Sequence, residues 1–359
     1  MKHVIAVLVA LVTVMFGIAS GAWADDAKKG VFDARNEFNI NIPKGAHQIR
    51  AWFVMPQDDP AQVVSNMKVE SPYKHRIVKD SEGNSLIYIE IENPDKESFS
   101  VTNSFTITRK EVRVSVDPKK ARPYTKADIK GMEKYLGQNK HIVIDEEIKK
   151  LANEIVGNEK NPVTASRKIY DWTLHNVDYW VKNPKDKKAS KVGDSQYCLL
   201  SRTGNCTDFH SLYTAISRAA GIPTRLVYGS FFKAELDGKD KDQSYHCWVE
   251  FFAPKIGWIP LDVAIADIFD GEFPLTADNT AYVNLTTADG YSGPDTSKVN
   301  YYFGSIEERR VTWTRGRDLI LEPKQAGEPV NAMSKAYVEI DSKESTDWTR
   351  KLTYHKGAL

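Results

Sequence analysis

Short runs of alternating apolar and polar residues dominate the first third of the chain. An alternation with a period of two predicts β-strands, and the prolines and aspartates between the runs predict turns between antiparallel neighbours. We therefore predict an antiparallel β-sandwich over residues 25–117. The strand-like runs are FNINI from Phe38 to Ile42, QIRAWFVM from Gln48 to Met55, SLIYIEI from Ser85 to Ile91, and a longer run from Phe99 to Val116.

A helical period appears in the middle of the chain. Apolar residues recur at three- and four-residue spacing between Ile148 and Val156. Asp145 precedes this run as a predicted N-cap, and Gly157 follows it as the predicted end of the helix. A second helix is predicted over residues 162–175, because asparagine followed by proline is typical of a first helical turn.

A third amphipathic run carries a cysteine at its start. Apolar residues from Phe209 to Ala220 share one helical face, and Gly221 ends the run. Asn205 is a predicted N-cap, so Cys206 falls in the first turn, where unpaired backbone amides and the helix dipole stabilise negative charge. Thiol pKa values at such positions can fall from about 8.5 to roughly 3.5 to 7.5. The position predicts a nucleophilic thiolate, although a cysteine that only packs in the core fits it equally well.

Two strand-like runs, SYHCWVEFF and GWIPLDVA, follow some way after the cysteine and predict a β-hairpin. If the hairpin closes around Pro254, His246 and Asp262 lie directly opposite each other. A one-residue change of register would move the aspartate to the other face of the sheet. The same register pairs Glu250 with Trp258 and Trp248 with Pro260.

Together these residues predict a catalytic triad. A carboxylate beside an imidazole fixes its tautomer and leaves the second ring nitrogen to take a proton from sulfur. Taken singly, each partner has an ordinary explanation, since a strand histidine often makes a core hydrogen bond and a terminal aspartate often forms a turn. The order Cys206, His246, Asp262 in this strand context favours catalysis.

These segments resemble the core of the transglutaminase-like superfamily, specifically its bacterial secreted members. The resemblance covers roughly residues 146–325 and is most specific in the helix GNCTDFHSLYTAISRAAGIPTRLVYG and the strands YHCWVEFF and GWIPLD. It implies a papain-like α+β fold with Cys206 as nucleophile, His246 as base and Asp262 as orienting acid. The stretch over residues 301–325 is also similar to the segment after the triad in these proteins, which indicates an extension of the same domain.

Acyl transfer also needs a second hydrogen-bond donor for the developing oxyanion, beside the backbone amide of Cys206. Members of the superfamily use a tryptophan, glutamine or similar donor upstream of the cysteine. Gln196, Tyr197 and Trp180 are all candidates. We predict Gln196, for which a surface glutamine in a loop is an equally good interpretation.

The other candidate chemical groups are interpreted as structural. Three cysteines are few and odd in number for an exported protein, which argues against a disulfide framework. Cys247 is predicted to point to the opposite strand face from His246 and to pack in the core, and Asp208 and His210 are predicted to be structural. A zinc site that includes Cys198 lacks any C-x-x-C spacing, so no metal or cofactor is predicted.

The N-terminal residues predict export. A lysine precedes an apolar stretch from Val4 to Ile18, and Ala22-Trp23-Ala24 forms an A-x-A cleavage site. Fewer than the ~20 apolar residues needed for a membrane span are present, so a periplasmic or secreted protein without a span is predicted. With 49 basic and 48 acidic residues, the chain has no electrostatic basis for binding nucleic acid.

We predict an exported cysteine-dependent acyl-transfer enzyme that acts on amide bonds of peptides or proteins, with cell-wall peptide among the candidate substrates. Hydrolysis is favoured over crosslinking, because no second nucleophile-binding feature is visible. The alternative is a catalytically silent module that binds a peptide or a cell-wall polymer. The predicted organisation is a signal peptide (1–24), β-sandwich (25–117), linker (118–143), transglutaminase-like catalytic domain (144–325), and C-terminal strand and tail (326–359).

Overall fold

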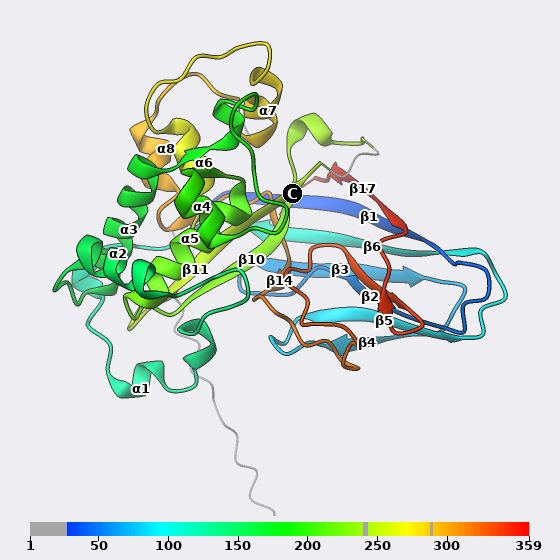
Figure 1. Ribbon diagram of the computed structural model, residues 1–359. Helices are drawn as coiled ribbons and strands as arrows, with labels where there is room; N and C mark the ends of the chain where they lie inside the picture. Colours follow the sequence, from blue (N-terminus) through cyan, green and yellow to red (C-terminus); the bar gives the residue numbers. More distant parts are fainter. Residues whose placement is uncertain (1–26, 240–242, 288–289, 359) are drawn as a thin grey trace, which may run out of the picture.

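The computed structural model describes residues 27–239, 243–287 and 290–358. The predicted signal peptide lies outside the described residues. Within those ranges, no helix has the length and apolar character needed to cross a bilayer. Helices and a four-stranded sheet of short strands form one side of the molecule, and a four-stranded and a five-stranded sheet, the two larger sheets, form the other (Figure 1).

The two larger sheets are antiparallel and pack face to face (Figure 1). Their strand orders are β17-β1-β6-β3 and β16-β15-β2-β5-β4. Apolar side chains from both sheets form one core, in which the rings of Phe38 and Phe53 lie 5.1 Å apart between centroids. The predicted N-terminal antiparallel β-sandwich is confirmed. Its strands are β1 (Lys29–Asn41), β2 (Gln48–Val54), β3 (Gln62–Glu70), β4 (His75–Lys79), β5 (Ser85–Glu92), β6 (Ser98–Lys110), β15 (Ala336–Ile340), β16 (Lys343–Glu344) and β17 (Trp348–Lys356).

The C-terminal segment supplies three of these strands. β17 lies beside β1 along most of its length, and β15 pairs with β2 so that Tyr337 faces Trp52. Leu352 and Tyr354, alternate residues of β17, are buried in the sandwich core. The pairing joins the two ends of the described chain, which a local sequence pattern does not encode.

The helical side has α5 at its centre, and α5 is buried along almost its whole length. The predicted caps are present, since Asp145 Oδ1 accepts a 2.9 Å hydrogen bond from Ile148 N–H and Gly157 ends α2. The helices are α1 (Lys126–Ile129), α2 (Glu146–Val156), α3 (Pro162–Asn176), α4 (Ser195–Ser201), α5 (Cys206–Ala219), α6 (Val263–Phe269), α7 (Thr280–Thr286) and α8 (Thr296–Tyr301), with short 3₁₀ turns η1 (Pro118–Lys120), η2 (Glu133–Tyr135), η3 (Trp180–Lys182) and η4 (Ala234–Leu236).

A four-stranded antiparallel sheet, β12-β11-β10-β14, packs against α5 (Figure 1). It also adjoins the sandwich, because Thr312 of β14 donates its N–H to Gln62 Oε1 at 3.0 Å. The predicted α+β fold class is therefore confirmed. The remaining strands are β7 (Val112–Arg113), β8 (Asp178–Tyr179), β9 (Thr203–Gly204), β10 (Thr224–Phe231), β11 (Tyr245–Ala253), β12 (Gly257–Leu261), β13 (Ser305–Ile306) and β14 (Arg310–Arg315).

The predicted register of the β11–β12 hairpin is wrong by two residues. Glu250 lies opposite Pro260 rather than Trp258. Proline suits the first central position of a turn, and Lys255 takes the second with φ of 73°, so the reversal centres one residue later than predicted. A shift of two keeps every side chain on its predicted face, but β12 now ends before Asp262.

Candidate active site

Cys206 begins α5, as predicted. The side chain of Asn205 accepts hydrogen bonds from the N–H groups of Thr207 at 2.9 Å and Asp208 at 3.1 Å. Asp208 in turn accepts from the N–H of Asn205 at 2.9 Å and from that of Ser190 at 3.0 Å, which confirms its structural role. The Cys206 N–H stands in the first turn, where no intrahelical acceptor exists, and so remains able to bind an anion.

His246 and Asp262 are in contact, although not as the cross-strand pair that was predicted. The distance from His246 Nε2 to Asp262 Oδ2 is 2.7 Å. Asp262 lies just beyond β12 and caps α6, where its Oδ1 accepts the Ile265 N–H at 3.0 Å. Burial would raise the pKa of Asp262, but the positive charges of His246 and Arg310 outweigh it and hold that pKa well below its usual range. The carboxylate is therefore ionised beside the imidazole.

Arg310 is a component of the site that the sequence did not reveal. Its Nη1 donates to Asp262 Oδ2 at 2.8 Å, and its Nε donates to Glu307 Oε2 at 2.9 Å. The guanidinium is fully buried and lies 4.2 Å from the centre of the Phe231 ring. Two glutamates and two arginines in a row are typical of an exposed turn, so the sequence offered no signal that Arg310 is buried against the acid.

The electrostatics of the site favour a thiolate next to an imidazolium. A hydrogen bond from Cys247, then the charge and hydrogen bond of His246, hold the pKa of the Cys206 thiol well below its usual range despite burial. Burial alone would lower the pKa of His246, but the Asp262 carboxylate and the Cys206 sulfur raise it overall. Cys206 and His246 are each only 4 % exposed, so these charges act in a largely water-free environment.

Cys247 and His210 lie at the site rather than in remote packing positions. Cys247 Sγ is 3.4 Å from His210 Nδ1 and 3.6 Å from Thr207 Oγ1. Burial, and then the hydrogen bond to Cys206, raise the pKa of Cys247 well above its usual range, so it remains a thiol. His210 Nε2 lies 3.5 Å from Asp262 Oδ1. The interpretation of Cys247 as core packing alone missed these contacts, which arise because α5 packs across β11.

Gln196 and Tyr179 differ sharply in their positions. Gln196 donates its side-chain amide to Asp145 Oδ2 at 2.8 Å, and no hydrogen bond among the described residues joins it to Cys206. For Tyr179, by contrast, burial, then the charge of Cys206, and finally a hydrogen bond to Cys206 raise the pKa of the phenol well above its usual range. The N–H of Tyr179 is held by Asp267 Oδ2 at 2.8 Å. The sequence missed Tyr179 because β8, which positions it, is too short to leave a pattern.

The other two upstream candidates are engaged elsewhere. Tyr197 donates its hydroxyl to the carbonyl oxygen of Lys188 at 2.8 Å. The ring of Trp180 packs against that of Tyr282, with 5.1 Å between their centroids. Of Tyr179, Trp180 and Tyr197, it is therefore Tyr179 whose pKa is raised by the Cys206 sulfur.

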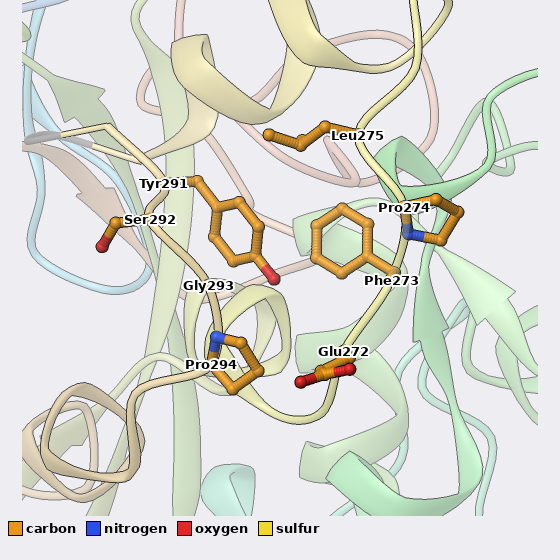
Figure 2. A pocket seen from close by; sticks show the side chains of 8 residues that line it. All are labelled: Glu272, Phe273, Pro274, Leu275, Tyr291, Ser292, Gly293 and Pro294. Atoms are coloured by element: carbon orange, nitrogen blue, oxygen red, sulfur yellow. The ribbon is translucent and has the colours of Figure 1, made fainter.

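A separate hollow of about 720 Å³ lies between the segments that follow α6 and precede α8 (Figure 2). Phe273 and Tyr291 face each other within it, with 4.8 Å between ring centroids, and Pro274 and Pro294 flank them. None of the predicted site residues lines this hollow. In the parts of the chain that the structure describes, no three His, Cys, Asp or Glu side chains are grouped so as to hold a metal ion.

Residues 149–263 match the family model of the transglutaminase-like superfamily. This segment is a transglutaminase-like core. It contains Cys206, His246 and Asp262, the three residues of the predicted triad. An uncharacterized protein of Haemophilus influenzae is 24 % identical over 351 residues, and the match covers 86 % of each chain. The uncharacterized protein YebA of Bacillus subtilis is 24 % identical over 128 residues, which cover 33 % of this chain and 17 % of YebA.

The arrangement of the transglutaminase-like core and the sandwich also occurs in a solved structure. A candidate cysteine protease from Cytophaga hutchinsonii matches with a TM-score of 0.57 and 14 % sequence identity, over 92 % of both chains. At this identity the likeness shows a shared fold. It extends well beyond the transglutaminase-like core, because the core model covers only residues 149–263.

Proposed function

We propose that this protein is an exported cysteine-dependent acyl-transfer enzyme that hydrolyses amide bonds in peptides or proteins. The observation that carries the proposal is the 2.7 Å contact between His246 and Asp262, next to a Cys206 thiol whose pKa is lowered. The transglutaminase-like core and the fold shared with a candidate cysteine protease support it. The A-x-A motif behind an apolar N-terminal stretch supports a periplasmic or secreted location.

In the acylation step, the Cys206 thiolate attacks the amide carbonyl carbon, and the carbonyl electron pair moves to oxygen. In this proposal the Cys206 N–H and the hydroxyl of Tyr179, whose pKa the sulfur raises, donate hydrogen bonds to that oxyanion. When the oxyanion collapses, the C–N bond breaks and His246 gives its proton to the departing amine. The products of this step are an acyl thioester on Cys206 and a free amine.

In the second step, water attacks the carbonyl carbon of the thioester, and His246 accepts a proton from that water. The C–S bond then breaks, which releases a carboxylic acid and restores the thiolate and imidazolium. Asp262 keeps the imidazole in one orientation throughout, and Arg310 keeps Asp262 ionised. We propose water as the acceptor because no second feature for binding an amine nucleophile was found in the sequence.

The test of this proposal is to trap the acyl-enzyme. The purified protein is mixed with a peptide library, quenched in acid and analysed by intact mass measurement. We expect a mass increase equal to the acyl part of a cleaved peptide, located on Cys206 and removed by hydroxylamine. Cleavage with an adduct on another residue, or peptide binding without any adduct or cleavage, would contradict the proposal, and the latter result would favour a silent binding module.

The oxyanion role of Tyr179 makes a separate prediction. Tyr179→Phe removes only the hydroxyl and is expected to lower kcat by roughly 10²- to 10³-fold with little change in KM. Tyr228→Phe is the matched control, because its buried hydroxyl has no hydrogen-bond partner among the described residues. Steady-state kinetics of both variants, and of Gln196→Ala, distinguish the two candidates. A large loss in Gln196→Ala with normal Tyr179→Phe would assign the oxyanion donor to Gln196 instead.

A further inference from the structure

Lys233 is a nearly buried cation for which the described part of the chain supplies no anionic partner. Lys233 is 5 % exposed, and its ammonium makes no hydrogen bond or ion pair with any residue that the structure describes. Its nearest aromatic contact is the ring of Phe231, whose centre lies 5.6 Å from Nζ. By contrast, Lys182, with 10 % of its side chain exposed, is paired with Asp267 at 3.0 Å. Because a lysine with so little exposure is rarely left without a partner, the position of Lys233 favours the binding of an anion there.

Lys233 belongs to the same surface as the catalytic histidine. In the sheet, Gly229 lies opposite His246, and Phe231 lies opposite Arg310. Because residues 229 and 231 of β10 point to the same face, the side chains of His246, Phe231 and Arg310 share that face. Lys233 continues this series beyond the end of β10, with an extended backbone at φ of −82° and ψ of 146°. The centre of the Phe231 ring is 6.4 Å from that of His246 and 5.6 Å from Lys233 Nζ, so the imidazole and the ammonium both lie close to the same aromatic side chain.

The Lys233 ammonium interacts electrostatically with the Cys206 sulfur. Burial first, and then the charge of Arg310, lower the pKa of Lys233 to about 8, while the Cys206 sulfur and Glu235 act in the opposite direction. At neutral pH the Lys233 side chain is therefore mostly in its protonated, positively charged form. It would attract a carboxylate and hold it near the carbonyl group that the sulfur attacks, since a charge-assisted hydrogen bond is strong in a dry site.

We infer that Lys233 forms an anion-binding subsite beside Cys206, and that the preferred substrate carries a carboxylate close to the amide bond that is cleaved. The second half of this inference rests on the proposed function, and the first half does not. The carboxylate comes either from the C-terminus of a peptide or from an acidic side chain. Both sources present the same carboxylate to the ammonium, so only peptides that differ in one source at a time can tell them apart.

The subsite is tested without any substrate by alkylating Cys206 at fixed pH and ionic strength. The second-order rate constant for iodoacetate, an anion, is divided by that for neutral iodoacetamide, which cancels the thiolate fraction. We expect this ratio to fall about tenfold in Lys233→Met and to be retained in Lys233→Arg. Lys150→Met, which alters an exposed lysine, is the control. Should the methionine variant fail to fold, Lys233→Gln gives the same comparison, and an unchanged ratio in a folded neutral variant overturns the inference.

Matched peptides then identify the source of the carboxylate. Peptides with a free C-terminus are compared with their C-terminal amides, and peptides with glutamate near the scissile bond are compared with those containing glutamine. We expect one pair to show a preference for the acid in kcat/KM of about tenfold or more that Lys233→Met removes. Acylation of Cys206 without any such preference would contradict the inference and would leave the proposed function supported. A charge-dependent alkylation ratio without acylation by any peptide would support the anion subsite and contradict the proposed function.

Discussion

Replacing Cys206 with alanine is expected to lower kcat by roughly 10⁵- to 10⁶-fold, to the level of residual binding and oxyanion stabilisation. The large effect follows because the sulfur is the atom that bonds to the substrate in the proposed mechanism. The fold should be retained, since alanine is favourable at the first position of α5 and the cap at Asn205 does not use the thiol. Initial-rate assays on a peptide found by acyl-enzyme trapping, with circular dichroism of both proteins, measure this.

Cys198→Ala is the matched control for that experiment. Cys198 is also buried, but it lies in α4, and burial raises the pKa of its thiol well above the usual range. Its loss should cost some stability through a small cavity while kcat stays near the wild-type value. Activity that survives in Cys206→Ala but not in Cys198→Ala would mean that the wrong cysteine has been assigned.

Asp262→Asn is expected to lower kcat by roughly 10³- to 10⁴-fold, because asparagine neither selects the required tautomer of His246 nor stabilises the imidazolium. Asparagine keeps the size of the side chain and can still cap α6. The pH dependence should change as well. The Asp262 carboxylate raises the pKa of His246, so its removal lowers that pKa and moves the alkaline limb of the kcat/KM profile to lower pH.

Glu307→Gln separates this catalytic effect from a loss of stability. Glu307 and Asp262 are the two carboxylates that neutralise the buried Arg310, at 2.9 and 2.8 Å. Each substitution leaves that guanidinium half-compensated, so both variants should lose a few kcal/mol of unfolding free energy, on the order of 3 kcal/mol. Only Asp262→Asn should shift the alkaline limb. Denaturant titration and pH–rate profiles of the two variants measure this, and an equal shift in Glu307→Gln would assign the pH effect to Arg310 instead.

Local sequence patterns predicted the parts of the site that depend on a single helical turn. Asn205, the cysteine that follows it and the glycine that ends α5 are a cap, a first turn and a stop, and each works through neighbours within four residues. The same applies to Asp145 and Gly157 at the ends of α2. Such features survive in any tertiary context, so the sequence is sufficient for them.

In the β11–β12 hairpin, strand alternation and turn chemistry predicted the structure only in part. Strand alternation predicted that His246 and Asp262 face the same side. The shift of two residues keeps the paired residues of the hairpin on their predicted faces, but Asp262 lies beyond the last pair and reaches His246 from the cap of α6. The residue on which the turn centres was predicted one position too early, at Pro254 rather than Lys255. Contact between the imidazole and the carboxylate was therefore predicted correctly, but through the wrong geometry.

The sequence by itself determined the transglutaminase-like core, the position of Cys206 at a helix start and the sidedness of its two partners, because these depend on period, capping and turn chemistry. Only the tertiary structure decided that Arg310 pairs with Asp262 and that Cys247 and Tyr179 act on the Cys206 thiol. These three come from β14, β11 and β8, which are far apart in the sequence and belong to two different sheets, so their approach depends on how those sheets pack beside α5. The pairing of β1 with β17 in one sandwich was also decided by the tertiary structure. Strands that are far apart in the sequence pair only when the whole fold brings them together, so no local sequence pattern predicts their pairing.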